Sequence, residues 1–343
     1  MSPEFIKFRR SFNKRVESIV MFLTSSCNLN CSYCYVDKKK ESMNFITARN
    51  SVDFLMNSPG EKKEIHFFGG EPLLAFGLIK RVIDYAESRY KKKIGYVITT
   101  NGILLDLKKA GYLKEKGFRI NISLDGPKAV NDKHRKLNNG KGSFDLIFRN
   151  ISGLKKAKIS FNINITVHPS SAKNLFKSCL FVLNNAGDDI NVLPVSLMPW
   201  KKKDIICFLK NSYDIISYYK KKKIKGRLNL IGSIKNAEDA SFSEYAVCPF
   251  KAAISIMPDG NIIFCHLFLY LNKIPMNYIT GNVNKGVKKE YHSCKLSNAE
   301  KCRNCSADYC RSFCKNFEKS NHSICTFHFI KLAKRLYEKH SKP

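Results

Sequence analysis

Short apolar runs alternate with amphipathic segments through the first two-thirds of the chain. The strand-like runs are Ile19–Thr24, Glu64–Phe68, Gly95–Thr99, Arg119–Leu124, Ser160–Val167 and Ile190–Leu197. The helix-like segments between them are Thr47–Asn57, Leu78–Tyr90, Asp106–Lys116, Phe144–Lys156 and Lys173–Asn184. Repeated strand–helix units join into a parallel sheet through right-handed crossovers. Since six units are too few for a closed eightfold barrel, we predict an α/β protein with a partial (β/α)6 barrel.

Four of the strand-like runs end in loops with distinctive residues. Three cysteines follow the first run, Gly69–Pro72 follows the second, Thr100–Gly102 the third and Ser123–Pro127 the fourth. In parallel barrels the active site is built from loops at the carboxyl ends of the strands. We therefore expect these four loops to meet in one site.

The cysteine content indicates metal or redox chemistry. There are 13 cysteines, and an odd number in an intracellular chain argues against a disulfide framework. Cys27, Cys31 and Cys34 form a Cys-x3-Cys-x2-Cys triplet, in which soft thiolates can wrap one face of an iron–sulfur cluster. Three ligands would leave one iron of an Fe4S4 cube open. The alternative is a zinc site completed by His66, although zinc favours paired cysteine elements and complete tetrahedral sets.

The triplet resembles the signature of the radical S-adenosylmethionine (radical SAM) superfamily. The resemblance implies that Cys27, Cys31 and Cys34 hold a [4Fe-4S] cluster whose open iron binds S-adenosyl-L-methionine (SAM). Gly69, Gly70, Glu71 and Pro72 match the loop that holds the amino group of SAM in this superfamily. Glycines let backbone carbonyls approach closely, and carbonyls with a carboxylate suit an ammonium group.

Three further residues match contacts of the superfamily with SAM. Tyr33 matches the aromatic residue that contacts adenine, and Ser123 and Arg135 match the ribose and carboxylate contacts. The alternative for the last two is a loop cap and a surface charge. The resemblance also implies the reaction: reductive cleavage of SAM gives a 5′-deoxyadenosyl radical, which abstracts a hydrogen atom from an unactivated C–H bond.

A second group of cysteines resembles the SPASM module of peptide-modifying radical SAM enzymes. Its members are Cys248, Cys265, Cys294, Cys302, Cys305, Cys310, Cys314 and Cys325. The resemblance implies two auxiliary [4Fe-4S] clusters, the first with Cys248, Cys265 and Cys314 and the second with Cys302, Cys305, Cys310 and Cys325. Cys294 is the candidate fourth ligand of the first cluster. The pattern departs by one residue between Cys305 and Cys310, and two structural zinc ions are the alternative.

These features predict a radical SAM domain over 1–235 and a SPASM domain with a C-terminal helix over 236–343. Together they imply SAM and three [4Fe-4S] clusters, one that binds SAM and two auxiliary ones. We interpret Cys179 and Cys207 as ordinary buried cysteines.

His266 bears on the choice of reaction. It follows Cys265 at the place where sulfatase-maturating members of the family carry a general-base Asp. A histidine could accept a proton near neutral pH, but the change favours a maturase that installs a thioether or carbon–carbon cross-link in a ribosomally made precursor peptide. The alternatives are an anaerobic sulfatase-maturating enzyme, which oxidises Cys or Ser to formylglycine, and a peptide epimerase.

The chain is strongly basic, with a net charge of +32. Lysine runs carry much of this charge, and they fit either a solvated surface or attraction of an acidic leader peptide. Because the triplet begins at residue 27, we expect no separate N-terminal domain that binds the leader. No aromatic-rich RNA-binding motif accompanies the charge, which argues against a nucleic-acid partner. No apolar run approaches the roughly 20 residues that span a bilayer, so we expect a cytoplasmic enzyme with no membrane partner. The resemblance to radical SAM enzymes implies a reductant such as flavodoxin or ferredoxin.

Overall fold

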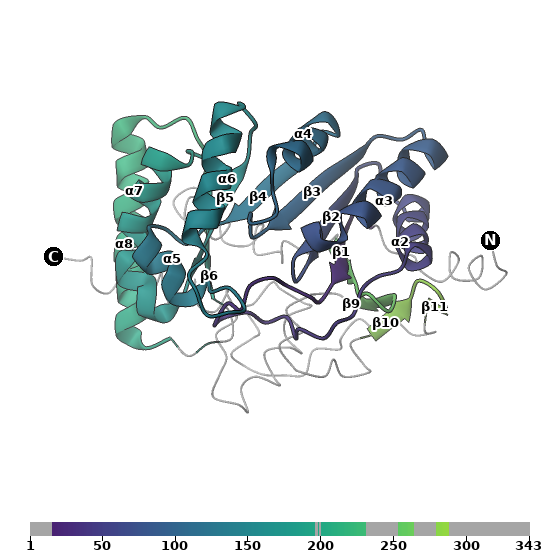
Figure 1. The fold of residues 1–343 in the computed structure, drawn as a ribbon, viewed down its shortest axis with the longest axis horizontal. Coiled ribbons are helices and arrows are strands. Elements are labelled where there is room, and N and C mark those ends of the chain that lie inside the picture. The colour runs from purple at the N-terminus through teal and green to yellow at the C-terminus, as the bar shows by residue number, and fades with distance from the viewer. Residues whose placement is uncertain (1–15, 196–197, 199, 231–252, 264–278, 288–343) are drawn as a thin grey trace, which may run out of the picture.

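The computed structural model describes residues 16–195, 198, 200–230, 253–263 and 279–287 (Figure 1). Its strands form one sheet in the order β11-β10-β9-β8-β1-β2-β3-β4-β5-β6-β7. The first seven are β1 (Ser18–Thr24), β2 (Lys63–Gly69), β3 (Ile94–Thr100), β4 (Arg119–Ser123), β5 (Asn162–Val167), β6 (Ile190–Pro194) and β7 (Leu228–Leu230). The others are β8 (Ala253–Ile256), β9 (Asn261–Ile263), β10 (Ile279–Asn282) and β11 (Gly286–Val287).

Strands β1 to β7 lie side by side in chain order, and all neighbours among them are parallel. The helices between them are α2 (Phe45–Asn57), α3 (Phe76–Arg89), α4 (Leu107–Glu115), α5 (Lys128–His134), α6 (Phe144–Lys156), α7 (Leu175–Asn185) and α8 (Lys202–Lys222). In Figure 1 these helices lie along the sheet, with α2 at one end and α7 and α8 at the other. This architecture confirms the predicted parallel α/β fold, and each of the six predicted strands and five predicted helices is present.

Two of the α-helices in the described residues were not predicted, and their composition explains why. Helix α8 starts and ends in lysine runs, which we interpreted as exposed charge, yet Ile205, Phe208 and Ile215 place a buried apolar stripe along it. Helix α5 has only seven residues and contains no long periodic pattern. Its position is set by tertiary contacts, which the periodicity of so short a segment does not report.

At β5 and β6 the sheet has one apolar and one polar face. Along β5, Ile163 and Ile165 are buried in the core that the helices cover, and Asn164 and Thr166 alternate with them and are half-buried. Asn191 of β6 donates a side-chain hydrogen bond of 2.9 Å to Asn164 on this second face. Because successive side chains of a strand point to opposite faces, the core lies between the sheet and the helices. The other face is polar at β5 and β6 but carries the buried Val20 and Phe22 at β1.

Strand β8 joins the sheet next to β1 although more than 200 residues separate them in the sequence. The two strands are parallel, with Ser18 opposite Ala253 and Met21 opposite Ile256. Strands β8 to β11 then continue the sheet in antiparallel pairs. The predicted domain boundary at residues 235 and 236 lies outside the described residues, as does most of the predicted SPASM domain, so that division stays a prediction.

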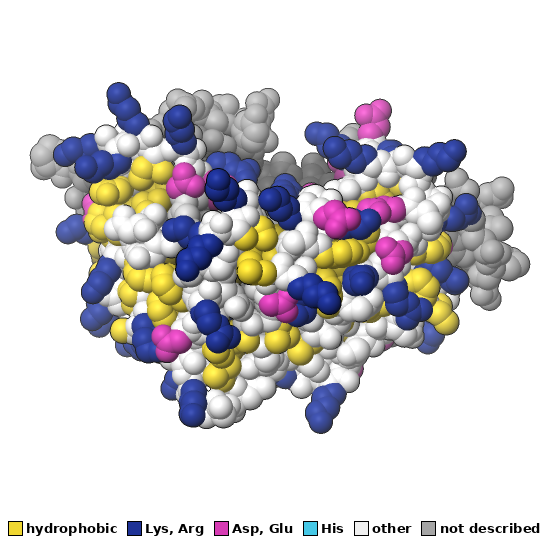
Figure 2. All heavy atoms as spheres, turned by 45° about the horizontal axis from the view of Figure 1, so that its top comes forward, with side chains coloured by type: hydrophobic (Ala, Val, Ile, Leu, Met, Phe, Trp, Pro, Cys, Tyr) yellow, Lys and Arg dark blue, Asp and Glu magenta, His cyan; other side chains and the backbone are white. Residues whose placement is uncertain are grey.

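The surface carries basic charge over a wide area. On the face drawn in Figure 2, Lys and Arg side chains are scattered among hydrophobic and acidic ones and do not gather in one stripe. Several are paired, such as Lys116 with Glu87 and Lys109 with Asp106. Such scatter is typical of a solvated basic surface. Among the helices of the described residues, none combines the length and the apolar composition needed to span a bilayer.

Candidate active site

The three N-terminal cysteines lie on a long loop between β1 and α2, residues 25–44, which we call the cysteine loop. It leaves β1 and runs to the segment after α5 (Figure 1). Backbone hydrogen bonds fix it there, from Asn30 N to the carbonyl of Lys136 (2.6 Å) and from Ser32 N to that of His134 (2.9 Å). Leu29 and Leu137 form an antiparallel bridge. The part of the loop from Leu29 to Ser32 is therefore held against the segment at the end of α5 and just after it.

The thiols of the cysteine loop are free and become more exposed along the chain. Cys27 and Cys31 are half-buried and Cys34 is exposed. Burial raises the pKa of Cys27 to about 11 and also raises that of Cys31. The backbone N–H of Leu29 and the side-chain amide of Asn101 donate to the Cys27 sulfur at 3.4 and 3.7 Å. N–H donors to sulfur suit a metal-bound thiolate, and binding there would displace the thiol protons.

Gly69 and Gly70 bring the loop after β2 against the backbone just before Cys27. A Cβ atom on Gly69, whose φ is +135°, would lie 2.3 Å from the carbonyl oxygen of Thr24, and one on Gly70 would lie 2.2 Å from that of Ser26. The N–H groups of Gly70 and Glu71 donate to these same oxygens at 2.7 and 2.9 Å. The glycines are thus required for contact between two loops of the protein itself.

Glu71 joins the loop after β2 to the loop after β3. Its carboxylate is fully buried and accepts hydrogen bonds from Leu73 N (3.0 Å), Thr100 Oγ1 (2.7 Å) and Asn101 N (2.8 Å). Burial raises the pKa of Glu71, and these three donors oppose the shift. We expected this carboxylate to face the amino group of SAM. In the structure it bridges two loops, and a contact with an ammonium group stays a prediction.

Tyr33 connects the cysteine loop to β4 and α5. Its hydroxyl donates to Asp125 Oδ2 at 2.5 Å and accepts from Arg135 Nη1 at 2.9 Å. The other oxygen of Asp125 accepts from Thr166 N of β5 at 3.0 Å. Burial raises the pKa of Tyr33, so the phenol stays protonated and able to donate. Burial also raises the pKa of Asp125, and the charge of Arg135 opposes that shift.

The other predicted SAM contacts lie at the same edge of the sheet. Ser123 is the last residue of β4 and is half-buried. Pro72 is buried and begins a short 3-10 helix, residues Pro72–Ala75, which is capped by the Glu71 side chain. The structure thus brings Tyr33, Ser123 and Arg135 to neighbouring loops. Their roles toward SAM stay predictions.

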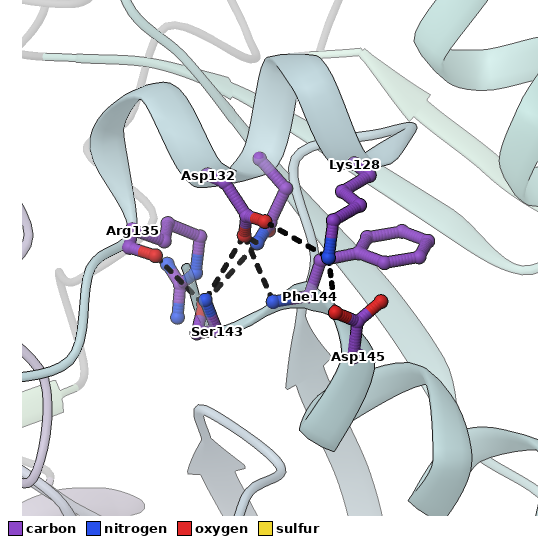
Figure 3. A network of polar contacts seen from close by, with 7 residues as sticks. Lys128, Asp132, Arg135, Ser143, Phe144 and Asp145 are labelled. Atoms are coloured by element: carbon purple, nitrogen blue, oxygen red, sulfur yellow. Dashed lines mark hydrogen bonds and ion pairs between the residues drawn. The ribbon is translucent and has the colours of Figure 1, made fainter. Parts of the chain in front are cut away.

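A polar network fixes helix α5, which ends directly before Arg135 (Figure 3). Asp132 of α5 accepts from the N–H groups of Ser143 (3.0 Å) and Phe144 (2.8 Å) and so caps the start of α6. Lys128 pairs with Asp132. Because Asp132 supplies the cap, the Ser143 hydroxyl is left to donate to the carbonyl of Arg135 at 2.7 Å. The position of Arg135 is therefore determined by the junction of α5 and α6.

The residues present fit a SAM-binding cluster. Arg135 is 5% exposed, and its Nε is buried without a hydrogen-bond partner among the described residues, as expected of a donor that meets an anionic ligand. In the described ranges no three Cys, His, Asp or Glu side chains are grouped around a point that could hold one metal ion. A cube differs because each cysteine binds a separate iron. The zinc alternative gains no support, since His66 bonds Thr99 at 2.8 Å.

Three residues of this region were not among the predicted site residues. Asn101 lies beside Cys27, Asp125 bonds Tyr33, and His134 bonds Ser32 with Nδ1 to Oγ at 2.8 Å. Asn101 and Asp125 follow β3 and β4 directly, so their position at strand ends was the available signal. His134 had no such signal, because it is placed by α5.

The predicted auxiliary ligands lie outside the described residues, as does the predicted proton acceptor His266. The auxiliary ligands are Cys248, Cys265, Cys294, Cys302, Cys305, Cys310, Cys314 and Cys325. Of the two cysteines interpreted as structural, Cys179 is buried in α7 and Cys207 is half-buried in α8.

Comparison with known proteins identifies the class to which this fold and site belong. The Radical SAM superfamily family model matches residues 21–175, which include the cysteine loop and the sheet as far as β5. The chain is 32% identical over 252 residues to an uncharacterized protein of Methanocaldococcus jannaschii, covering 73% of this chain and 85% of that protein. The chain belongs to the radical SAM superfamily, whose members use SAM and a [4Fe-4S] cluster.

Its relatives include named enzymes that modify proteins or peptides. A cysteine-type anaerobic sulfatase-maturating enzyme of Clostridium novyi is 26% identical over 347 residues, covering 90% of both chains. The solved structure of anSMEcpe with bound AdoMet and Cp18Cys peptide superposes with a TM-score of 0.70 at 22% identity, covering 93% of this chain and 99% of that one. SuiB of Streptococcus suis with bound S-adenosylmethionine gives 0.63 at 17%, covering 90% and 75%. These two structures share the fold.

Proposed function

We propose that this radical SAM enzyme abstracts a hydrogen atom from a residue of a ribosomally made precursor peptide and installs a thioether or carbon–carbon cross-link. The observation that carries the proposal is the convergence of the loops after β2, β3 and β4 on the cysteine loop. Two proteins of similar fold support a peptide substrate, because anSMEcpe is solved with Cp18Cys and SuiB with its precursor peptide SuiA.

Within this proposal Cys27, Cys31 and Cys34 would hold the cluster. When bound, the cluster and SAM supply the one-electron cleavage that generates the hydrogen-abstracting radical. The protein's own contribution is position. Glu71 and Asn101 join the strand-end loops around Cys27, and a fixed loop geometry lowers the cost of reaching a reactive arrangement.

Tyr33 and Arg135 would contact SAM from the side of the cysteine loop away from Glu71 and Asn101. The Arg135 guanidinium is held by Tyr33 and keeps an unpartnered Nε, which suits the carboxylate of SAM. Ser123, at the end of β4, is the candidate ribose contact. Gly69 and Gly70 would present backbone carbonyls to the amino group of SAM beside the buried Glu71.

Two auxiliary [4Fe-4S] clusters complete the proposal, on the SPASM-like cysteines given above. They would relay electrons to or from the substrate, and His266 would accept a proton near neutral pH. A small reductant such as flavodoxin or ferredoxin would supply the electron, and the basic surface would attract an acidic leader peptide. The enzyme would act in the cytoplasm.

Formylglycine formation is the second candidate. The observation that favours it is the sulfatase-maturating relative of Clostridium novyi, which matches over 90% of both chains. The opposing observation is His266 in place of the expected Asp. The two reactions differ in atom balance: a cross-link removes two hydrogens, whereas oxidation of cysteine to formylglycine replaces the thiol and one hydrogen by an oxygen.

This difference provides the test. The anaerobically reconstituted enzyme is incubated with SAM, dithionite and one of two peptides: the small precursor encoded beside its gene, or a sulfatase-type peptide that contains cysteine. Mass spectrometry of the peptide and measurement of 5′-deoxyadenosine are the readouts. Loss of two hydrogens from the precursor supports the proposal, and conversion of cysteine to the aldehyde supports the second candidate.

Two further outcomes are informative. An unchanged mass with an inverted stereocentre would indicate an epimerase and overturn the cross-link proposal. Rapid SAM cleavage with neither peptide altered would contradict a peptide substrate. Iron analysis tests the auxiliary clusters, because three Fe4S4 clusters require about 12 iron atoms per chain, and about 4 iron with zinc would refute them.

A further inference from the structure

Two consecutive residues at the end of α5 contact two consecutive residues of the cysteine loop. His134 contacts Ser32 and Arg135 contacts Tyr33. Both contacted residues lie between Cys31 and Cys34. The end of α5 and the residue after it therefore hold Ser32 and Tyr33, the segment between Cys31 and Cys34, by hydrogen bonds.

The contact between His134 and Ser32 has two parts. The carbonyl of His134 accepts from Ser32 N at 2.9 Å, and Nδ1 of its ring lies 2.8 Å from Ser32 Oγ. One residue of α5 thus fixes both the backbone and the side chain of Ser32. Since Ser32 directly follows Cys31, a rotation of this serine would move the Cys31 thiol.

A second pair of residues supports the ring of His134 from behind. The ring stacks on His168 with a centroid distance of 4.1 Å and an interplanar angle of 24°. Its Nε2 lies 3.1 Å from Ser170 Oγ, which in turn is 2.9 Å from Nδ1 of His168. His168 and Ser170 follow β5, so the ring is held between the cysteine loop and the loop after β5.

One backbone donor fixes one of these ring nitrogens, and it is consistent with one complete set of hydrogen bonds. Ser170 N–H donates to Nδ1 of His168 at 3.1 Å, so this nitrogen carries no proton, and the Ser170 hydroxyl can donate to it as well. Ser170 Oγ can then accept from Nε2–H of His134, which leaves Nδ1 of His134 to accept from Ser32. The chain of donors is complete when both rings are neutral.

Burial favours that neutral form. His134 is 8% exposed, and burial, followed by the charges of His168 and Lys133, lowers its pKa to about 4. Burial and Lys133 also lower the pKa of His168, against which Asp204 acts. The backbone of α5 is anchored by Asp132 at the start of α6 (Figure 3). The ring is therefore held in place and in its neutral form.

We propose that His134 is a positioning residue for the cluster site, which holds the Cys31–Cys34 segment in its binding geometry through Ser32. Ser170 and His168 orient its ring for this task. The inference rests on a cluster at Cys27, Cys31 and Cys34 and does not depend on the identity of the substrate.

Two substitutions separate the two hydrogen bonds of the His134 ring, one with Ser32 and one with Ser170. His134→Asn keeps an acceptor near the position of Nδ1 and so retains the contact with Ser32, but it cannot reach Ser170. His134→Gln keeps a donor near the position of Nε2 and retains the contact with Ser170, but it loses the side-chain contact with Ser32 Oγ, while the backbone hydrogen bond from Ser32 N remains. The experiment uses the full chain with its clusters, purified without oxygen, and Lys133→Gln as the control, because Lys133 is an exposed neighbour on α5.

The readouts are the change that SAM produces in the electron paramagnetic resonance spectrum of the reduced protein and the rate of iron loss to a ferrous chelator. Substitution of residues that orient metal ligands costs about 10- to 100-fold in metal affinity or activity. We expect His134→Gln to raise the SAM concentration needed for the spectral change, or the rate of iron loss, by that range. In His134→Asn the SAM concentration and the rate of iron loss should lie nearer the wild-type values, and in Lys133→Gln both should equal them.

Unfolding midpoints separate this role from a general loss of stability. Equal defects in His134→Asn and His134→Gln would overturn the proposal, because the two differ in the Ser32 contact. A wild-type spectrum and iron retention in His134→Gln would also overturn it, whatever its midpoint. Ser170→Ala gives an independent check, since it leaves α5 untouched and should weaken the spectral response by less than His134→Gln does.

Discussion

The hydroxyl of Tyr33 donates a 2.5 Å hydrogen bond to the carboxylate of Asp125, 92 residues further along the chain. This contact joins the segment between Cys31 and Cys34 to the end of β4. Because Asp125 is buried and Arg135 donates to the same hydroxyl, one oxygen atom satisfies a buried anion and a buried cation. The link from the cysteine loop to the ends of β4 and α5 depends on that single atom.

Removal of this oxygen should be costly. Tyr33→Phe removes the donor to Asp125 Oδ2 and the acceptor of Arg135 Nη1, while Thr166 N still donates to Asp125 Oδ1. Loss of one partner of a buried charged group costs about 1–3 kcal/mol or more. We expect a lower free energy of unfolding in urea and weaker SAM binding. Tyr112→Phe is the control, since its buried hydroxyl has no hydrogen-bond partner among the described residues. A Tyr33→Phe enzyme as stable as Tyr112→Phe would contradict the assigned role.

Gly70 should not tolerate a side chain. Its Cβ would lie 2.2 Å from one backbone oxygen and 2.7 Å from another, and a backbone cannot move aside as a flexible side chain can. Gly70→Ala should therefore displace the cysteine loop and reduce the iron content. At Gly77 of α3 nothing lies within 4 Å of a Cβ, so Gly77→Ala should be neutral or stabilise by about 0.5–1 kcal/mol. Equal iron content in the two variants would contradict the packing argument.

Cys31 should be indispensable for SAM cleavage. Cys31→Ala removes one of three ligands, and we expect no 5′-deoxyadenosine on incubation with SAM and dithionite. Cys207→Ala, in α8, should keep wild-type cleavage because this residue lies outside the site. Full activity of Cys31→Ala would disprove its role as a ligand.

Glu71 should stabilise the protein because both oxygens of its carboxylate accept hydrogen bonds. In Glu71→Gln one oxygen becomes an NH2 group, which cannot accept from Asn101 N or from the pair formed by Leu73 N and Thr100 Oγ1. A buried donor left without an acceptor costs about 1–3 kcal/mol. Chemical denaturation should show a loss of this size, and wild-type stability would mean that the bridge is unimportant.

The protonation of His134 predicts a pH dependence of stability. Its pKa is about 6.5 in the unfolded chain and about 4 in the folded protein, so between these values the unfolded chain binds more protons. The free energy of unfolding therefore falls as the pH drops from about 6.5 to about 4, by at most about 1.4 kcal/mol per pH unit from this group. Urea unfolding of iron-free wild type and His134→Asn should converge at low pH; a constant difference would argue against the shift.

The elements and the cysteine loop were predictable because their signals are local. Periodicity of apolar residues located β1 to β6, and the strand-end rule brought Cys27, Gly70 and Ser123 to one edge of the sheet. The helix α6 has the bounds that its pattern predicted. In each case the information lies within a few residues of the feature.

The remaining features depend on contacts between distant segments. The direction of the Glu71 carboxylate follows from Thr100 and Asn101, which the sequence places about 30 residues away. Asp125 and His134 become part of the site only when β4 and α5 meet the cysteine loop. No local pattern reports such meetings, and the pairing of β8 with β1 is of the same kind.

The pairing of β8 with β1 has a consequence for how the chain can be divided. Ser18 to Met21, the stretch of β1 that leads to the cysteine loop, has Ala253 to Ile256 on one side and β2 on the other. A polypeptide cut after residue 235 would leave that flank of β1 with bare amide and carbonyl groups, a template for self-association. Expression of the N-terminal part alone should therefore yield aggregates, and adding residues 253–287 as a separate peptide should restore solubility.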